Sequence, residues 1–121
     1  MPVLVVDAAN VVGSRPDGWW RDRPGAANRL HARLVAPGLD EDVVLVVEGA
    51  ARRGPDEGVD GRVTTVHAPG SGDDAIVDVV RRLRDGGQQV LVVTADRGLR
   101  HRVTDLGACV EGPSWLLEQL P

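Results

Sequence analysis

Hydrophobic residues gather in short runs that end at polar or acidic positions. Residues 3–6, 43–47 and 90–93 are uninterrupted aliphatic runs, and residues 63–66 form a more alternating one. Runs of four or five Val and Leu residues between polar groups are typical of strands covered on both faces. A shorter stretch at 108–110 predicts a fifth strand.

Between these runs, apolar residues recur with helical spacing. One segment carries Ile76, Val79, Val80 and Leu83, which is the i, i+3, i+4, i+7 pattern of a single helix face. Helices are predicted over 24–35, 73–84, 97–106 and 114–120. Residues 49–60 are rich in Gly, Pro and charge, so they predict a loop.

The order of these elements indicates the fold class. Strands that alternate with helices favour right-handed crossovers and a mostly parallel sheet with helices on both faces. We therefore expect one α/β domain over residues 1–121, a three-layer α/β/α sandwich with a sheet of four or five strands. The link between the second and third strands lacks a clear helical pattern.

Composition narrows the cellular setting. Hydrophobic residues make up 42% and charged residues 26%, which is an ordinary globular balance. No apolar run approaches the roughly 20 residues of a membrane helix, and the opening MPVLVVDAAN lacks the basic segment of a signal peptide. The single cysteine, Cys109, excludes an intrachain disulfide and is expected to be buried in a strand. These features predict a cytoplasmic protein with no membrane partner.

The basic residues exclude several enzyme classes. All 14 are arginine. A P-loop, a Schiff-base enzyme and a haloacid-dehalogenase-type phosphatase each need a lysine that this chain lacks. The net charge of −4 argues against bulk electrostatic coating of nucleic acid, but it is compatible with a local basic rim.

Acidic residues follow each of the four main strands. Asp7 follows the first, Glu48 the second and Asp96 the fourth, while Asp73 and Asp74 open the helix after the third. The carboxyl ends of parallel strands meet at one edge of a sheet, where open α/β folds bind ligands. Like charges repel there unless a cation lies among them. Carboxylate oxygens are the ligands that Mg²⁺ and Mn²⁺ prefer, so the sequence predicts a metal site.

Each of these acids also has a purely structural interpretation. Asp7 can form an Asx-turn, Asp96 can cap the helix that follows it, and Glu48 can pair with a surface arginine. Ser71 and Asp74 fit a capping box. If each acid had only such a structural role, there would be no reason for all of them to follow the carboxyl ends of strands. Their shared position therefore favours the metal site.

Helical geometry ranks the acids of the third helix. At about 100° per residue, Asp73 lies near the core-facing stripe, whereas Asp74 and Asp78 lie on the opposite side. Asp73 is therefore the better inward ligand. Asp74 is expected to reach the metal from the first turn, directly or through water, and Asp78 to be solvated.

Four motifs in this order resemble a known family. They are VVDAANVVGS with Asp7 and Asn10, VVEG with Glu48, GDDAIVDVV with Asp73 and Asp74, and VLVVTADRGLRHRV with Asp96. Together with the closing LGACVEGPSWLLEQL, they resemble the NYN-domain proteins. That family is a branch of the PIN-like nucleases and includes YacP-like and Regnase-like ribonucleases. The resemblance covers nearly the whole chain and implies a single NYN/PIN-like domain.

The resemblance implies a metal-dependent endoribonuclease. Water activated by carboxylate-bound Mg²⁺ or Mn²⁺ would hydrolyse RNA phosphodiester bonds. Asn10 would orient Asp7 or a water. The implied catalytic set is Asp7, Asn10, Asp73, Asp74 and Asp96, and Glu48 joins the carboxylates as a metal ligand. Two positions depart from the family, since Glu48 replaces a common aspartate and Arg100 replaces an acid that some Regnase-like members carry.

Arginine and tryptophan near the acidic edge indicate a polyanionic substrate. Guanidinium groups donate paired hydrogen bonds to phosphates, and tryptophan rings in an Arg-rich loop provide surfaces on which unpaired bases stack. Trp19 and Trp20 have alternative roles in closing over the core or in a homodimer contact, whereas Trp115 is expected to pack the terminal helix. The predicted RNA-binding residues are Arg15, Trp19, Trp20, Arg21, Arg52, Arg53, Arg97 and Arg100.

Two other functions remain open. The acidic edge would also serve a metal-dependent nucleotide phosphohydrolase, or the domain could be a non-catalytic RNA-binding or partner module. A haloacid-dehalogenase-like enzyme would need DxD after the first strand, where position 9 is alanine, and a GxGxxG dinucleotide motif is absent. His67 near this edge is expected to be a hydrogen-bonded structural residue.

Overall fold

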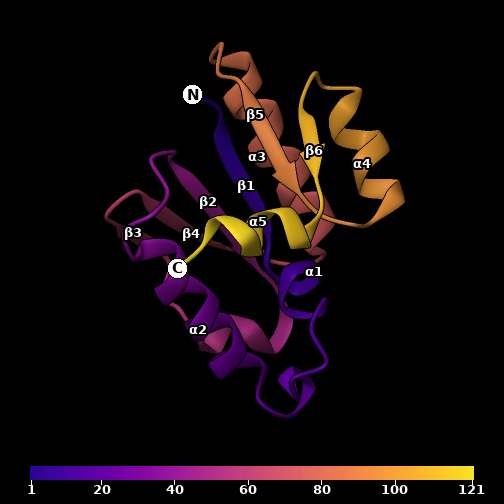
Figure 1. Cartoon of the computed structure of the whole chain (residues 1–121). Helices are drawn as coiled ribbons and strands as arrows, with labels where there is room; N and C mark the ends of the chain where they lie inside the picture. Colours follow the sequence, from indigo (N-terminus) through magenta and orange to yellow (C-terminus); the bar gives the residue numbers. More distant parts are fainter.

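The computed structural model describes residues 1–121 and consists of one twisted sheet flanked by helices (Figure 1). The strands are β1 (Val3–Asp7), β2 (Val43–Val47), β3 (Gly58–Asp60), β4 (Val63–His67), β5 (Val90–Val93) and β6 (Cys109–Glu111). The helices are α1 (Ala8–Val12), α2 (Arg23–Val35), α3 (Gly72–Asp85), α4 (Arg97–Thr104) and α5 (Pro113–Gln119). Two 3₁₀ turns, η1 (Trp19–Arg21) and η2 (Gly49–Arg53), join them.

The six strands lie in the order β3-β4-β2-β1-β5-β6, and only β3 runs antiparallel to its neighbour. β1 lies in the middle, with Val6 opposite Leu45 of β2 on one side and opposite Val93 of β5 on the other. The chain moves outward from β1 through β2 to β4 and then crosses back to β5. The carboxyl ends of β1 and β5 therefore flank the topological switch point, where folds of this kind bind ligands.

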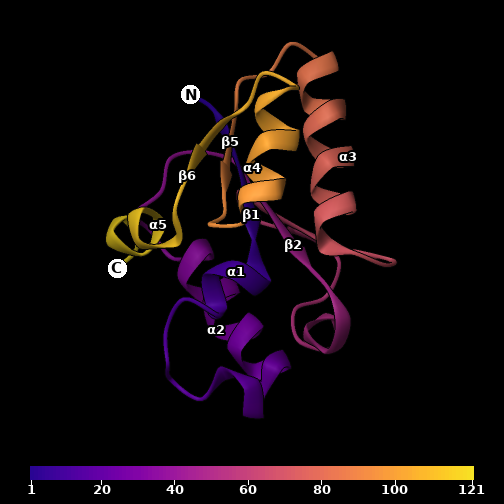
Figure 2. The ribbon, with the colours of Figure 1, turned by 90° about the vertical axis from the view of Figure 1, so that its right-hand side faces the viewer.

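Two hydrophobic clusters, one on each face of the sheet, hold the layers together. Leu4 and Val6 of β1 pack with α1, α2 and α5, whereas Val5 packs with α3 and α4. Successive side chains of a strand point to opposite faces, so the unbroken run VLVV serves both clusters. Figure 2 shows the two helical layers on either side of the strands. The predicted three-layer, mostly parallel α/β class is confirmed.

The longest helix, α3, begins and ends where its sequence directs. The Ser71 hydroxyl accepts a hydrogen bond from the Asp74 amide at 3.4 Å, which caps the first turn. Ile76 and Val80 are completely buried against the sheet. The helix stops at Gly86, and the following Gly87 adopts a φ of 80° that favours glycine. This anchoring fixes the first turn of α3 beside the carboxyl ends of the strands.

The sheet has six strands rather than four or five, because residues 58–60 form an additional edge strand. All three residues of β3 are exposed, so no hydrophobic pattern marks it. η2 occupies the start of the predicted loop. α1 was also not predicted, since five residues are too short to show a helical period.

The sequence predicted the environments of one residue in β6 and one in α5, and the structure contradicts the first prediction and confirms the second. Cys109 is exposed, so the prediction that it is buried was wrong. It lies on β6, an edge strand paired only with β5, which leaves one flank open. Trp115 of α5 packs against the first hydrophobic cluster, as predicted.

None of the helices combines the length and apolar character required for a membrane span.

Candidate functional site

Asp7 is the most buried acid of the acidic edge. It is the last residue of β1 and the N-cap of α1, and only 5% of its surface is exposed. Oδ1 accepts a hydrogen bond from the Asn10 amide at 3.3 Å, and Oδ2 accepts one from the Thr94 hydroxyl at 2.9 Å. Both carboxylate oxygens are therefore held in place by donors from two neighbouring strand ends.

Thr94 links the ends of β1 and β5. It directly follows β5 and is completely buried. Its hydroxyl donates to Asp7 and accepts from the Asp96 amide at 3.1 Å. Thr94 stands in the VLVVTADRGLRHRV segment, but its side chain was given no role from the sequence. The signal that the sequence offers is a threonine directly after a strand and two residues before Asp96.

Asn10 ties α1 to the same loop. Its Oδ1 accepts a hydrogen bond from the Ala95 amide at 2.9 Å. The side chain thus spans from the first turn after β1 to the turn after β5. This contact places Asn10 beside Asp7 and fixes the backbone between Thr94 and Asp96.

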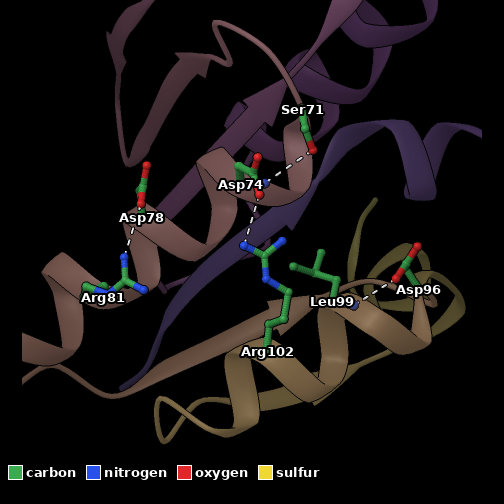
Figure 3. A network of polar contacts seen from close by, with 7 residues as sticks. All are labelled: Ser71, Asp74, Asp78, Arg81, Asp96, Leu99 and Arg102. Carbon is green, nitrogen blue, oxygen red and sulfur yellow. Dashed lines mark hydrogen bonds and ion pairs between the residues drawn. The ribbon is translucent and has the colours of Figure 1, made fainter.

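Asp96 is the N-cap of α4. Its Oδ1 accepts a hydrogen bond from the Leu99 amide at 2.8 Å (Figure 3). No protein group donates to Oδ2, and the residue is half-buried. The capping role is therefore real, and it leaves one carboxylate oxygen available to a ligand.

Glu48 reaches from the end of β2 to the start of α3. Its Oε2 accepts a hydrogen bond from the Gly72 amide at 2.7 Å, while no protein group donates to Oε1. A Cβ on residue 72 would lie 2.9 Å from the Glu48 Cδ. Glycine at position 72 is what allows this close approach.

Asp73 lies in the first turn of α3 and is half-buried. No protein donor contacts its carboxylate. Burial raises its pKa, and the charges of Asp96 and Glu48 raise it further. Burial likewise raises the pKa of Asp7 to about 6, and Asp73 and Glu48 add to that rise against the hydrogen bonds from Thr94 and Asn10. The four carboxylates thus share one region of negative potential.

Asp74 and Asp78 face away from this region. Asp74 is exposed, and its Oδ1 lies 3.0 Å from the Arg102 guanidinium of α4 (Figure 3). Asp78 pairs with Arg81 of the same helix at 3.3 Å. The structure separates Asp73 from Asp74 as helical geometry predicted, and it gives Asp74 a structural partner between α3 and α4.

The donor chemistry suits a hard divalent cation, since all four inward groups are carboxylates. A cation would also relieve the mutual repulsion that raises the pKa of Asp7 and Asp73. However, no three acidic, histidine or cysteine side chains stand close enough to form a ready-made metal group. The residues fit a metal ion in chemistry and charge, and the group is not preassembled.

The predicted RNA-binding arginines lie in three different environments. The Arg52 Nη1 donates to the Ala68 carbonyl at 3.3 Å, and the Arg100 Nε donates to the Thr94 carbonyl at 2.9 Å, so both brace loops of the site. Arg53 and Arg97 are exposed and have no protein partner. Arg15 lies in a groove of about 200 Å³ between α1 and α2, which Arg29 and Arg33 also line. These last two were not predicted.

The two neighbouring tryptophans differ in environment. Trp19 is half-buried, whereas Trp20 is 50% exposed. Their rings meet edge to face at 5.9 Å. Arg23 lies over the Trp19 ring at 5.2 Å, and Arg21 lies over the Trp20 ring at 5.9 Å. The loop after α1 is therefore a small aromatic and cationic assembly.

His67 has a structural role, as predicted. Its Nε2 donates to the Pro55 carbonyl at 2.7 Å, and its backbone amide donates to Glu57 at 2.9 Å. These bonds hold residues 55–57 against the end of β4. The imidazole is thus not available to the acidic edge.

Comparison with known proteins defines the fold. No protein-family model and no curated protein matches the sequence. Two crystal structures of Rae1 (YacP) from Bacillus subtilis do match, one of them of a point variant, with TM-scores of 0.79 for the variant and 0.78. Each alignment covers 98% of this chain at 20% identity, and 74% and 72% of the YacP chain respectively. The chain therefore has a YacP-like fold.

Proposed function

We propose that this chain is a metal-dependent endoribonuclease whose site lies at the carboxyl ends of β1, β2 and β5 and at the start of α3. The observation that carries the proposal is the meeting of Asp7, Glu48, Asp73 and Asp96 at the topological switch point, where burial and mutual repulsion raise the pKa of two of them. Four carboxylates kept in one region without a direct ion-pair partner are costly unless a cation binds there.

Two further observations support RNA as the substrate. The YacP-like fold agrees with the sequence motifs, which resemble a group of ribonucleases that includes YacP-like proteins. Two arginines without a hydrogen-bond or ion-pair partner follow these strands in the chain, since Arg53 ends η2 after β2 and Arg97 begins α4 after β5. Guanidinium groups in such places hold backbone phosphates and position a strand over the acids.

Each residue of the site has a defined task in this proposal. Asp7, Asp73 and Asp96 would hold Mg²⁺ or Mn²⁺, and Glu48 would complete the shell. The ion, when bound, would supply charge neutralisation for the phosphodiester and a more acidic water. Thr94 and Asn10 fix Asp7 and the 94–96 loop, so that the acids are positioned before the substrate arrives. Asp74 would act only from the outer part of the site, since Arg102 already pairs with it.

The decisive experiment compares Asp96→Asn with Asp78→Asn on a set of single-stranded and structured RNAs in Mg²⁺ or Mn²⁺. Asparagine also caps helices well, so α4 is expected to survive in the first variant. Even outer partners of metal sites typically contribute about 10- to 100-fold, so Asp96→Asn should lower cleavage by about 100-fold or more. Asp78 pairs with Arg81 on the exposed side of α3, so its variant should cleave like the wild type.

One observation favours a non-catalytic RNA-binding module instead, namely that the acids do not form a ready-made metal group. This alternative predicts RNA binding that is unchanged by EDTA, with no cleavage in any metal. Activity on nucleoside triphosphates but not on RNA would instead identify a nucleotide phosphohydrolase. Product analysis on both substrate types separates the three functions.

A further inference from the structure

A hollow of about 320 Å³ opens directly beside the acidic site. It lies between α1, α2, η1 and η2, and Glu48 forms part of its wall. Small side chains on three of these elements, Ala9, Ala27 and Ala51, leave the space open. The hollow is therefore a consequence of the sequence, and it is continuous with the proposed metal site through Glu48.

Trp19 supplies an aromatic wall to this hollow, and Trp20 does not line it. The chain has only three aromatic residues, all tryptophan, so the presence of one here is not a product of general aromatic content. Arg23 also lines the hollow and lies 5.2 Å over the Trp19 ring. The lining of the hollow thus combines the Trp19 indole, small apolar walls, the Arg23 guanidinium and the Glu48 carboxylate.

We propose that this hollow binds one unpaired nucleobase of the RNA, next to the phosphodiester that lies over the acids. A nucleobase has flat, apolar faces and is joined through its ribose to a backbone phosphate, so the Trp19 ring suits the base and the Arg23 guanidinium suits the phosphate. The inference rests on the proposed function, because it is RNA in the acidic site that brings a base to Glu48. It assigns base recognition to Trp19 and not to Trp20.

The test is a scan of RNA binding with a single abasic nucleotide placed at successive positions of one oligonucleotide. Stacking on an aromatic residue contributes about 1–3 kcal/mol, so Trp19→Ala should weaken binding of intact RNA by about 5- to 150-fold. One abasic position should weaken wild-type binding by a similar factor and have no added effect in Trp19→Ala. Fluorescence anisotropy measures both, with Ca²⁺ and with EDTA.

Trp20→Ala is the matched comparison, since it removes the neighbouring tryptophan, which lies outside the hollow and packs edge to face against Trp19. In this variant the sensitive abasic position should still weaken binding by the same factor as in the wild type. Loss of the abasic effect in Trp20→Ala as well, or a Trp19→Ala loss that adds to the effect of every abasic position, would overturn the proposal.

A second variant guards against misfolding of Trp19→Ala. Ala9 is an exposed position of α1 that lines the hollow, so Ala9→Leu fills the space while it keeps the aromatic wall. It should reproduce the binding loss with unchanged thermal stability. If the protein cleaves RNA with metal but no abasic position weakens binding, the base pocket is rejected and the proposed nuclease function stands. If one abasic position weakens binding but the protein does not cleave RNA, the base pocket is supported and the proposed catalysis is rejected.

Discussion

The Thr94 hydroxyl donates to the Asp7 carboxylate at 2.9 Å and accepts from the Asp96 amide at 3.1 Å. One completely buried side chain therefore sets the position of two candidate metal ligands on neighbouring strand ends. The hydrogen bond between Thr94 and Asp7 joins residues that are 87 positions apart in the chain.

Thr94→Val tests this link, because valine has nearly the same shape without the hydroxyl. Asp7 and the Asp96 amide would each lose a partner in a buried setting, which typically costs about 1–3 kcal/mol of unfolding free energy. Loss of an outer partner should also lower Mn²⁺ affinity and cleavage by about 10- to 100-fold. Urea unfolding and metal titration measure the two effects.

The chain offers a matched control in Thr65 of β4. It is also buried, but its hydroxyl has no hydrogen-bond partner. Thr65→Val should leave the free energy of unfolding unchanged or raise it by about 1 kcal/mol. A loss as large as that of Thr94→Val would show that valine itself, and not the missing hydrogen bonds, is responsible.

Gly72→Ala should damage the site without damaging the helix. The new Cβ would lie 2.9 Å from the Glu48 Cδ and displace that side chain, whereas alanine favours a helix over glycine by about 1 kcal/mol. Mn²⁺ affinity should fall by about tenfold, as for other displaced shell groups. Isothermal titration and thermal unfolding distinguish the two effects. Gly86→Ala at the other end of α3 meets only ordinary contacts and should leave metal affinity unchanged.

The raised pKa of Asp7 predicts a pH-dependent stability in the absence of metal. Its folded pKa of about 6 lies above the ordinary pKa of 3.8 for an aspartate, so between these limits the unfolded chain has released a proton that the folded chain retains. The contribution of Asp7 to the free energy of unfolding is therefore complete at low pH and falls as pH rises from about 4 to about 6. Above that range it stays constant, after a total loss of about 3 kcal/mol.

Urea unfolding of the wild type and Asp7→Asn in EDTA across this range isolates the effect from other acids. The variant should gain stability relative to the wild type as pH rises. A constant difference between the two proteins would show that Asp7 titrates normally.

The strands and the acids that follow them were predictable from local pattern. Four aliphatic runs each became a strand, and periodicity on α3 separated Asp73 from Asp74. The edge strand β3 and the exposure of Cys109 were not predictable in this way. Both depend on which strands lie at the edge of the sheet, and strand order is a property of long-range pairing.

The sequence by itself determined the strand ends, and with them which acids follow the carboxyl ends of the strands, because hydrophobic period and chain direction are local properties. Only the tertiary structure decided what each side chain does there. It assigned Arg52 and Arg100 to backbone carbonyls, Trp19 to a hollow and Thr94 to two acids. Those roles depend on distances between residues far apart in the chain, which packing of the helices on the sheet fixes and residue order does not.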